Sequence, residues 1–560
     1  MVFLTLTSFA NAFVPILLAR AITLLETTGN LFFLIVLIII SLVLNILAWI
    51  FNYFRQIHSS RVIGDVVLDL RRDVDHAVLN NDLSFFDKYP TGKIVSRVNT
   101  DSRDFGRAAS LFMQTTSSIF VVFIILAAMI RINSRLTIVF LLMAPLIFAV
   151  ALSFRKVARR RTLLGQRALA VVNAFVQESI TGIQVAKTFR QESKLYDKFN
   201  NVNTQSYQVN LSRAIVTTTI FPTLSIVQGL TLALLIYYGG SATLQGQINA
   251  GDLYLFLQSL QILFFPLLSI ASFWPSFQAG LSASERIFAL IDTPPAVIQR
   301  NNLKHKIKGE IVFDKLQFQY KEGQKVFERF SLKIRAGESV AIVGHTGAGK
   351  SSLANLLARF YEFQEGDIRI DGTSIRDFDL LHYRSCIGLI PQTPFLWADS
   401  LENNVKYGKP SATQEEVFWS LEQAGGSDWV EDLPKGLDTN VRERGSLLSM
   451  GQRQLVSFAR VLLEDPCILI LDEATASVDP FTETRIQDAL ERTMTNRTSI
   501  IIAHRLWTVR HVDRIIVLDH GRIIEEGNHM ELMASGGHYA KLYNKYFRHQ
   551  SLEYIEQVKQ

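Results

Sequence analysis

The chain has 560 residues, which is too many for a single hydrophobic core, so at least two domains are expected. Hydrophobic residues make up 48% of the chain and charged residues only 19%, a balance that favours a membrane protein. The net charge of +6 fits either a nucleic-acid-binding protein or basic residues that flank membrane helices on the cytoplasmic side, and the positions of the charges decide between the two.

Six long apolar stretches fill the part of the chain before residue 290. Each is close to the ~20 residues that a helix needs to cross a bilayer. They occupy residues 2–25, 31–54, 115–130, 136–154, 214–238 and 253–275. Met1 lies almost at the start of the first stretch with no basic segment before it, so we expect no cleaved signal peptide and a first span that is retained.

The segments that connect these stretches differ sharply in charge. Residues 55–110 contain nine Lys or Arg and residues 155–213 contain eleven, whereas the three opposite connections together contain only Arg131 and Arg135. The two basic segments and both termini therefore face the cytoplasm. Both segments are amphipathic, which predicts membrane helices that continue into the cytosol and turn there. This asymmetry accounts for much of the positive charge without nucleic acid.

After residue 290 the pattern changes to short β-branched runs that alternate with amphipathic helical segments, as in an α/β domain. We expect a transmembrane domain at residues 1–285, a linker at 286–309 and this second domain at 310–550. The chain's two cysteines, Cys386 and Cys467, lie in the second domain. Two thiols provide no disulfide framework and suit a reducing cytosol, so we expect both to be inert packing residues.

A phosphate-binding motif lies between a predicted strand at 340–343 and a predicted helix at 352–360. Residues 344–351 read Gly-His-Thr-Gly-Ala-Gly-Lys-Ser and match GxxxxGK[ST], and the flanking strand and helix argue against a chance match. Glycines let backbone N–H groups approach phosphates, Lys350 would reach the β and γ phosphates, and Ser351 would hold Mg²⁺. The residues expected at the nucleotide are Gly344, His345, Thr346, Gly347, Ala348, Gly349, Lys350, Ser351 and Ser352.

Two carboxylates, Asp472 and Glu473, directly follow the apolar run from Cys467 to Leu471. Ligands bind at the carboxyl ends of strands in α/β sheets, so Asp472 suits a metal contact there. Glu473 is then placed to polarise the attacking water in phosphoryl transfer. A solvated pair at the start of a helix is the alternative.

Residues 448–454, Leu-Ser-Met-Gly-Gln-Arg-Gln, resemble the signature sequence of the ATP-binding cassette (ABC) family, which usually reads LSGGQ. Few other P-loop proteins carry this segment. Further motifs of the family match in chain order: Tyr320 as the adenine-stacking aromatic residue, Gln392 in Ile390-Pro391-Gln392 as the Q-loop, Ser477-Val478-Asp479 as the D-loop, and His504 in Ala503-His504-Arg505 as the switch histidine.

The resemblance implies a role for each matched residue. Tyr320 would stack on adenine, and Gln392 would order the attacking water or Mg²⁺. His504 would hold the γ-phosphate and Glu473 in position. A core or surface tyrosine and a structural histidine are the alternatives. The implied catalytic residues are Glu473, His504 and Gln392, the implied metal ligands are Ser351, Gln392 and Asp472, and the signature residues at the nucleotide are Ser449, Gly451 and Gln452.

The membrane half resembles the exporter branch of the same family. Residues 85–87, Phe-Phe-Asp, and 91–97, Thr-Gly-Lys-Ile-Val-Ser-Arg, match the segment around its first cytosolic coupling helix. Residues 178–183, Glu-Ser-Ile-Thr-Gly-Ile, match the region that leads into the second turn. In that family these turns dock on the ATPase domains, the second on the partner's domain. Importers usually keep the two domains on separate chains, which disfavours that branch.

The resemblance therefore implies an α-helical membrane domain of six transmembrane helices with long cytosolic extensions, followed by an α/β P-loop ATPase domain with a helical subdomain. One chain supplies half of each nucleotide site, so a dimer that binds ATP and Mg²⁺ is expected. Its function would be ATP-driven export of an amphiphilic small molecule, drug, lipid or peptide by alternating access across the bacterial plasma membrane, with a cytoplasmic ATPase domain. An ATP-gated channel or membrane-bound regulator of the same fold is the alternative, whereas the spans and charge bias exclude a soluble nucleic-acid machine.

Three features depart from the family pattern. Met450 stands where the signature has glycine, so a heterodimer with a chain that carries an ordinary signature is favoured, and a homodimer that tolerates Met450 stays open. Asn440 stands where an acidic residue is frequent. The amphipathic segment that usually precedes the first span is not seen before Met1, so we expect a late start of the sequence or loss of that segment.

The sequences of the membrane spans give little information about the substrate. Polar and aromatic side chains in the last two spans could line a cavity that accepts amphiphiles, although packing between helices or against lipid is favoured. They are Phe221, Gln228, Gln258, Gln261, Phe264 and Phe265. Arg20 in the first span is a further candidate, because an arginine at the bilayer centre costs about 2.5–3.5 kcal/mol unless it snorkels to the interface.

Overall fold

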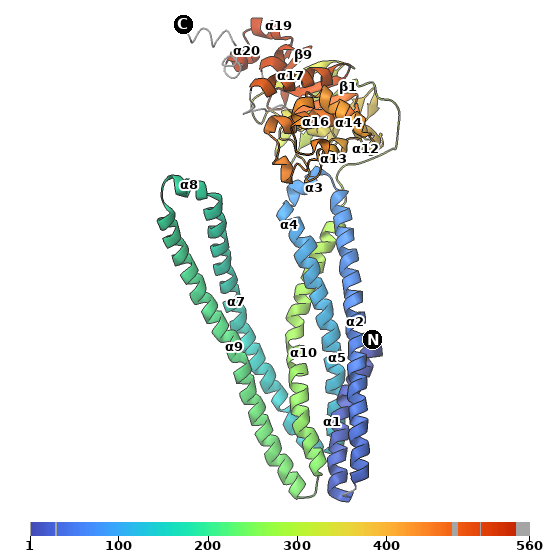
Figure 1. The fold of residues 1–560 in the computed structure, drawn as a ribbon, viewed down its shortest axis with the longest axis vertical. Coiled ribbons are helices and arrows are strands. Elements are labelled where there is room, and N and C mark those ends of the chain that lie inside the picture. The colour runs from blue at the N-terminus through green and yellow to red at the C-terminus, as the bar shows by residue number, and fades with distance from the viewer. Residues whose placement is uncertain (1, 29–30, 473–479, 504–505, 545–560) are drawn as a thin grey trace. The chain divides into compact units, whose positions relative to one another are not determined.

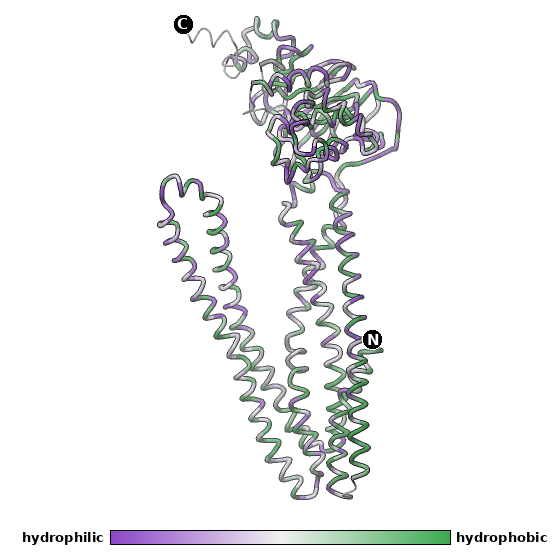
Figure 2. Tube along the Cα trace, in the orientation of Figure 1, coloured by the Kyte–Doolittle hydropathy of each residue, from purple (hydrophilic) through white to green (hydrophobic). Residues whose placement is uncertain are grey.

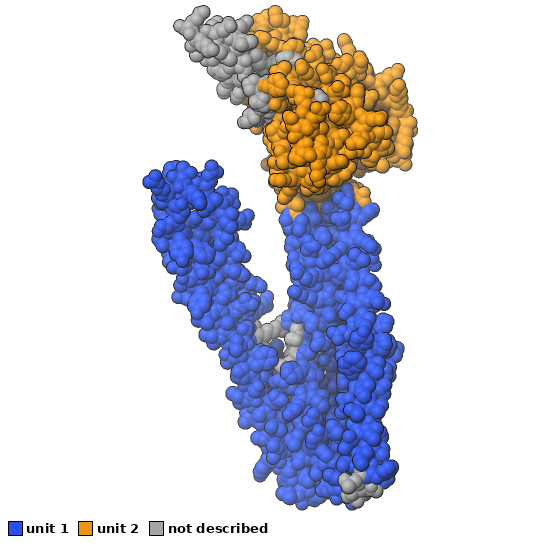
Figure 3. Space-filling view, in the orientation of Figure 1, with its two compact units in different colours: residues 1–79, 92–293 blue, residues 80–91, 294–560 orange. Residues whose placement is uncertain are grey.

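The computed structural model describes residues 2–28, 31–472, 480–503 and 506–544. The chain divides into two compact units, which Figure 3 colours separately. The first unit contains Met1–Leu79 and Gly92–Thr293, and the second contains Asn80–Thr91 and Pro294–Gln560. The short segment 80–91, which lies between two membrane-domain helices in the sequence, therefore belongs to the second unit.

Helices make up the first unit (Figure 1). They are α1 (Val2–Thr28), α2 (Leu31–Leu79), α4 (Thr91–Ser96), α5 (Ser102–Ile132), α6 (Ser134–Leu141), α7 (Met143–Thr181), α8 (Ile183–Thr188), α9 (Glu192–Leu244) and α10 (Ala250–Ile291). One π-helical turn, η1 (Arg97–Asp101), joins α4 to α5. The last helix, α10, continues past residue 285, where the end of the transmembrane domain is expected.

Five helical segments in the described ranges are long and apolar enough to cross a membrane. They are Val2–Thr27, Phe32–Leu79, Thr91–Ile132, Glu192–Leu244 and Ala250–Leu267. The fourth predicted span, residues 136–154, is divided between α6 and α7 by a break at Leu142. Neither α6 nor the apolar start of α7 is long enough by itself, which is why this span does not appear as one continuous apolar helix.

Side-chain caps set two of the turns between the helices. Asn133 ends α5, and its side-chain oxygen accepts a hydrogen bond from the backbone N–H of Leu136 at 3.1 Å, which starts α6 at once. A capping box formed by Asn249 and Asp252 starts α10. Both turns are therefore fixed by the local sequence, and they lie on the side of the membrane that the charge pattern assigns to the exterior.

The helices of the first unit pack in pairs. α7 and α9 run along each other and are joined by α8, while α10 packs on α5 and α1 packs on α2. A core between the helices includes the fully buried side chains of Ile125, Met129, Leu235 and Phe256. Figure 2 shows apolar residues gathered along the same stretch of these helices, with polar residues more frequent toward the α8 end of α7 and α9. That distribution matches helices that cross a membrane and extend beyond it.

The second unit contains two β-sheets. The first is antiparallel with the order β2-β1-β4-β5, and its strands are β1 (Ile311–Gln319), β2 (Lys325–Ile334), β4 (Glu365–Ile370) and β5 (Thr373–Ser374). The second has the order β10-β9-β3-β8-β7-β6, with strands β3 (Ser339–Gly344), β6 (Ile387–Ile390), β7 (Ile468–Asp472), β8 (Thr498–Ile502), β9 (Arg514–Asp519) and β10 (Arg522–Gly527). All strand pairs in the second sheet are parallel except β9 with β10.

The parallel strands are almost continuous apolar runs because both faces of the sheet are covered. Every residue of β8 is buried, and so are four of the five residues of β7. The strand predicted at 340–343 is confirmed as β3, and the apolar run at 467–471 overlaps β7. The helices of this unit are α3 (Leu83–Lys88), α11 (Lys350–Leu357), α12 (Leu380–Ser385), α13 (Leu401–Lys406), α14 (Gln414–Gln423), α15 (Ser427–Glu431), α16 (Met450–Glu464), α17 (Pro480–Met494), α18 (Leu506–Arg510), α19 (His529–Ala534) and α20 (His538–Leu542).

The helices α13 to α16 are inserted between β6 and β7 and form the expected helical subdomain. They pack around buried side chains that include Leu401, Val405, Val417, Leu421 and Phe458. In the sequence, this insertion lies between Gln392, which follows β6, and Asp472, which ends β7. Two strands that are neighbours in the sheet are therefore far apart in the sequence.

Candidate functional site

The turn between β3 and α11 is shaped by its glycines. Gly347 and Gly349 have φ angles of 86° and 104°, a region that residues with a side chain rarely adopt. A Cβ at Gly344 would lie 2.2 Å from the backbone oxygen of Leu518, so only glycine fits between β3 and β9 there. A Cβ at Gly347 would meet nothing within 4 Å, so the turn is open at this point. The result is a backbone loop at the start of a helix, which is a suitable cradle for phosphates.

Lys350 is the first residue of α11, and it is only 7% exposed. Its ammonium group donates hydrogen bonds to the backbone oxygens of Gly344 at 2.8 Å and His345 at 3.0 Å, so it spans the turn. Burial lowers the pKa of Lys350, and the nearby carboxylate of Asp472 opposes that shift. A desolvated cation beside an open glycine-rich turn fits an anionic phosphate, so the residues present suit a nucleoside triphosphate.

Other predicted site residues follow the carboxyl ends of strands in the same sheet. Asp472 ends β7 and is paired in register with Ile502 at the end of β8. Gln392 follows β6 and is exposed, and the Ser351 side chain is exposed at the start of α11. Parallel strands β6, β7, β8 and β3 bring these segments to one edge of the sheet. Glu473, His504 and the segment Ser477-Val478-Asp479 lie outside the described residues.

Tyr320 lies just after β1 and is 42% exposed. Its hydroxyl group is hydrogen-bonded to the hydroxyl of Ser352 at 3.0 Å, which ties it to the P-loop helix α11. The edges of Phe318 and Tyr361 meet it with ring centroids 4.7 Å and 5.0 Å away. This aromatic residue is therefore held beside the phosphate-binding turn, where part of its surface stays open to a ligand.

The signature segment forms the N-terminus of α16. Ser449 and Gln452 make a capping box, in which the Gln452 N–H donates to the Ser449 hydroxyl at 3.2 Å and the Ser449 N–H donates to the Gln452 side-chain oxygen at 2.8 Å. Met450 is the first helical residue, and its sulfur lies 3.8 Å from a guanidinium nitrogen of Arg453. Gly451 is buried. The helix start is thus well formed, and Met450 adds a side chain beside it.

Asn440 is the other departure from the family pattern in this region. Its side-chain oxygen accepts a hydrogen bond from the backbone N–H of Arg442 at 2.8 Å, and its backbone pairs with that of Ser400. Arg442 and Arg444 both have positive φ angles, so the loop before the signature is tightly turned. Asn440 therefore has a local role in shaping this loop.

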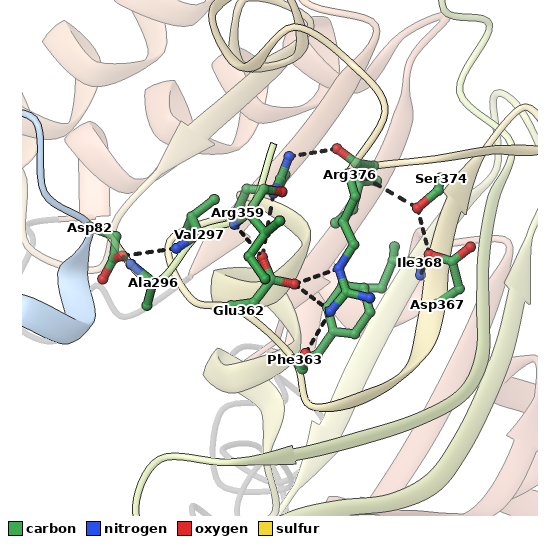
Figure 4. Close-up of polar contacts among 12 residues, drawn as sticks. Asp82, Ala296, Val297, Arg359, Glu362, Phe363, Asp367, Ile368, Ser374 and Arg376 are labelled. Atoms are coloured by element: carbon green, nitrogen blue, oxygen red, sulfur yellow. Dashed lines mark hydrogen bonds and ion pairs between the residues drawn. The ribbon is translucent and has the colours of Figure 1, made fainter. Parts of the chain in front are cut away.

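The segment 80–91 is held on the second unit by Asp82, a residue that the sequence analysis did not select. Its carboxylate accepts hydrogen bonds from the backbone N–H groups of Ala296 and Val297 at 2.5 Å and 3.1 Å (Figure 4). It also caps α3, because it accepts from the backbone N–H of Ser84 at 3.0 Å. Asp82 thus joins the short helix α3 to the segment that follows α10.

Two further contacts fix α3 to the ATPase fold. The Tyr361 hydroxyl donates to the Asp87 carboxylate at 2.7 Å, and the backbone N–H of Leu83 donates to the oxygen of Phe360 at 3.3 Å. Burial, followed by the hydrogen bond to Asp87, raises the pKa of Tyr361. Because Tyr361 also contacts the ring of Tyr320, a continuous set of contacts links α3 to the edge of the nucleotide site.

A buried ionic cluster also holds the segment that follows α10. Arg359 is 1% exposed and donates to the backbone oxygens of Ile298 and Ile375. Glu362 accepts from Arg376 at 2.6 Å and from the Ile298 N–H at 2.9 Å (Figure 4). The cluster therefore fixes the chain at Ile298, next to the residues that Asp82 holds. A sequence signal for Asp82 exists in hindsight, since aspartate is a preferred N-cap, but none identifies its distant partners.

The first unit contains a cavity of about 390 Å³. Its lining combines apolar residues with three amides, and it consists of Asn11, Val14, Pro15, Leu18, Asn45, Val121, Gln258, Ile262 and Pro266. Gln258 is thus the cavity candidate that the structure places at this lining. Phe264 is instead buried at 6% exposure, while Phe221, Phe265, Gln261 and Arg20 are exposed and Gln228 is half-buried.

Comparisons with known proteins agree with this arrangement. Residues 1–267 match the family described as ABC transporter transmembrane region, and residues 327–476 match the family described as ABC transporter. The chain is 37% identical to the ABC transporter ATP-binding protein YknV of Bacillus subtilis, with 94% of this chain and 88% of that one covered. It is 34% identical to an ATP-dependent lipid A-core flippase of Desulfotalea psychrophila, with 92% and 90% covered.

A solved structure is also similar over nearly the whole chain. It is that of a bacterial Atm1-family ABC exporter with ATP bound, with a TM-score of 0.81, 26% sequence identity and 97% of each chain covered. The similarity extends through both the helical unit and the α/β unit, so the chain contains the same two kinds of domain, in the same order, as a known exporter.

Proposed function

Because the chain belongs to the ABC transporter family, as an exporter half-transporter that couples ATP hydrolysis to transport, we propose that it exports an amphiphilic substrate as one half of a heterodimer. It is an integral protein of the bacterial membrane with several spans and a cytoplasmic ATPase domain. The proposal rests most directly on the segment 80–91, a membrane-domain connection that is built into the ATPase unit through Asp82 and Asp87. Such a segment gives nucleotide-driven motion a mechanical path to the membrane helices.

In this proposal the nucleotide site uses residues at one edge of the sheet. Lys350 contacts the β and γ phosphates, Tyr320 contacts the adenine, and the backbone of 344–349 cradles the phosphates. Ser351, Gln392 and Asp472 hold Mg²⁺, which when bound offsets negative charge on the phosphates. Glu473 accepts the proton of the attacking water, and His504 holds Glu473 and the γ-phosphate in position.

A second chain is required, as in other exporters of this family, and α8 is proposed to contact it. The described residues around α8 expose a group of apolar side chains, namely Ile180, Ile183, Val185 and Phe189. The ATPase unit exposes an aromatic group of complementary character, Phe395, Trp397 and Tyr407, with 50% to 63% exposure. We assign α8 of each chain to the aromatic group of its partner, because exposed apolar patches of this kind mark interaction sites.

Met450 favours a heterodimer over a homodimer. Glycine at this position lets the helix N-terminus come close to a γ-phosphate, whereas methionine adds a Cβ and a flexible side chain at the point of approach. The nucleotide site that includes this chain's signature is then the weaker one. The other nucleotide site contains this chain's P-loop and keeps Lys350, Gln392 and Asp472. It would be fully active if a different partner chain supplied a signature with glycine at the position of Met450.

The cavity in the first unit suits an amphiphile. Most of its lining is apolar, while Asn11, Asn45 and Gln258 supply donors and acceptors for a polar group. The relative named above is described as a lipid A-core flippase. A phospholipid or other lipid is the substrate class that the lining supports for this chain. The described residues that form this lining include no side chain with a formal charge, which favours zwitterionic or uncharged headgroups.

The heterodimer is tested with the purified chain in lipid nanodiscs. We expect little ATPase activity from the chain alone, and a rise in activity when Met450→Gly restores the signature, because each homodimeric site then contains the glycine. Full activity of the unmodified chain, unchanged by Met450→Gly, would contradict the heterodimer. Leu447→Gly, a neighbouring exposed apolar residue outside the helix, is the matched control and should leave the activity low.

A further inference from the structure

The chain's two cysteines are brought together by the sheet. Cys386 is the residue before β6, and Cys467 is the residue before β7, so 80 residues of sequence separate them. β6 and β7 are parallel neighbours, and Ile387 is paired with Ile468 in register. The two cysteines therefore occupy adjacent positions at the same end of two neighbouring strands.

The local geometry places the Cys467 sulfur against the backbone of Cys386. The Cys467 thiol donates to the backbone oxygen of Cys386 at 3.4 Å, and the same oxygen accepts from the Ile468 N–H at 3.0 Å. Neighbouring strands lie about 4.8 Å apart. Disulfides join residues whose Cα atoms are roughly 4.4–6.8 Å apart, so a bond between the two sulfurs requires no large backbone movement.

The two thiols differ in their tendency to ionise. A hydrogen bond from Cys467 lowers the pKa of the Cys386 thiol to about 6, with a smaller contribution from His382, while burial opposes the shift. The same hydrogen bond raises the pKa of Cys467. Both residues are only half-buried. Cys386 is thus the more readily ionised of two neighbouring cysteines, which is the arrangement of an attacking and a resolving cysteine.

We propose that Cys386 and Cys467 form a reversible redox site that closes to an intramolecular disulfide when the protein meets a peroxide. The Cys386 thiolate attacks one oxygen of hydrogen peroxide, the O–O bond breaks, and the other oxygen leaves as hydroxide, which takes up one proton to become water. The sulfur of Cys467 then attacks the sulfenic sulfur of Cys386, the S–O bond breaks, and a second water leaves with the Cys467 proton. The two thiols lose two electrons and the peroxide gains them, and a cytosolic thiol reverses the bond by exchange.

The site differs from the nucleotide site in position. Both cysteines precede their strands, whereas Gln392 follows β6 and Asp472 ends β7 at the opposite edge of the sheet. Neither cysteine is part of the proposed catalytic set, so serine variants can be prepared as folded, nucleotide-binding controls. A role as a metal site has less support, because the described part of the chain contains no group of three or more His, Cys, Asp or Glu that could hold a metal ion.

The test uses the full chain in nanodiscs, treated with hydrogen peroxide and then with a maleimide under denaturing conditions. We expect the treated protein to bind no maleimide, to lose the mass of two hydrogen atoms, and to recover both thiols after dithiothreitol. Peptide mapping should find Cys386 linked to Cys467 within one chain. Two thiols that remain open to maleimide, or a disulfide found only between chains, would overturn the proposal.

Two single variants separate the roles of the cysteines. In Cys467→Ser the serine hydroxyl can still donate to the remaining thiol, so Cys386 should form a sulfenic acid that dimedone traps. In Cys386→Ser the remaining Cys467 should react more slowly, by roughly tenfold, because it stays a thiol at neutral pH. Equal trapping in the two variants would remove Cys386 as the attacking residue. Unfolding of either variant, measured by circular dichroism, would be visible independently of the labelling.

Discussion

Burial determines how Lys350 can act on a nucleotide. The side chain is taken out of water and is oriented by two backbone oxygens before any phosphate arrives. Little side-chain entropy is then lost on binding, and a charge-assisted contact in a low-dielectric setting is stronger than one at the surface. The lysine is therefore expected to contribute mainly to affinity for ATP.

We predict that Lys350→Ala weakens ATP binding by about 10- to 100-fold, because a hydrogen bond to a charged group is worth about 1.5–3 kcal/mol. The dissociation constant of a fluorescent ATP analogue, measured on the full chain in nanodiscs, checks the value. Ser446→Ala, an exposed residue of the ATPase unit, is the control and should bind ATP normally. An unchanged dissociation constant in the lysine variant would show that Lys350 does not contact the phosphates.

Glu473 is assigned a different role, in hydrolysis rather than in binding. Glu473→Gln should bind ATP with normal affinity but turn it over about 10²- to 10⁴-fold more slowly, because the amide can still orient water and cannot accept its proton. Phosphate release and nucleotide affinity, measured on the same preparation, separate the two effects. Hydrolysis at the normal rate would remove Glu473 from the catalytic set.

Residues that belong to local motifs could be predicted from the sequence, and residues with distant partners could not. Lys350 could be proposed from the sequence because a strand, a turn and a helix surround it within a short window, and Asp472 could be proposed because it ends an apolar run. Asp82 was missed because its partners, Ala296 and Val297, follow more than 200 positions later. The cysteines were expected to be inert for the same reason, since only the sheet order places them side by side.

At the scale of elements, α3 is a short helix that depends on its surroundings. Six residues cannot form a stable helix alone, so the Asp82 cap and the contacts of Leu83 and Asp87 hold it in place. The Asp82 carboxylate also accepts hydrogen bonds from the chain that follows α10. Under the proposed function, movement of the ATPase fold would therefore reach two membrane-domain connections at once.

We predict that Asp82→Ser uncouples hydrolysis from transport. Serine can still cap α3, but it is too short to reach the N–H groups of Ala296 and Val297 as well. ATPase activity should persist, while transport per ATP hydrolysed should fall at least about fivefold, which corresponds to a coupling free energy of about 1 kcal/mol. The ratio is measured in proteoliposomes. Asp87→Asn keeps an acceptor for the Tyr361 hydroxyl and is the control on the same helix. A normal ratio of transport to ATP hydrolysis in Asp82→Ser would mean that the contact of Asp82 with Ala296 and Val297 is not needed for coupling.

The order of elements could be predicted better than their exact limits. Apolar length and the charge pattern predicted the membrane helices and their cytosolic extensions, because both signals are local. The break at Leu142 has a local signal that the sequence analysis did not use. Pro145, in the first turn of α7, has no N–H to donate to the backbone oxygen of Leu141, so a continuous helix cannot form through this point. The assignment of segment 80–91 to the ATPase unit depends on packing that no local pattern encodes.

At the scale of the whole molecule, one chain contains only half of the residues that each nucleotide site of the proposed transporter needs. The signature on α16 and the exposed apolar residues around α8 have partners in a second chain under the proposed assembly. Each chain then contributes a P-loop to one nucleotide site and a signature to the other, so that ATP binding joins the two halves and hydrolysis releases them. The redox site lies on a different edge of the sheet and needs no second chain.

The most direct test of ATP-driven export is uptake of a labelled phospholipid analogue into inside-out membrane vesicles prepared from the protein's own cells, so that the natural partner is present. Vesicles with the unmodified chain should move the analogue to the lumenal leaflet when ATP is added. Vesicles in which the chromosomal copy carries Lys350→Ala should show no ATP-dependent movement, at an equal amount of the chain. ATP-dependent movement that is the same in both preparations, or movement that requires no ATP in the first, would contradict export by this chain.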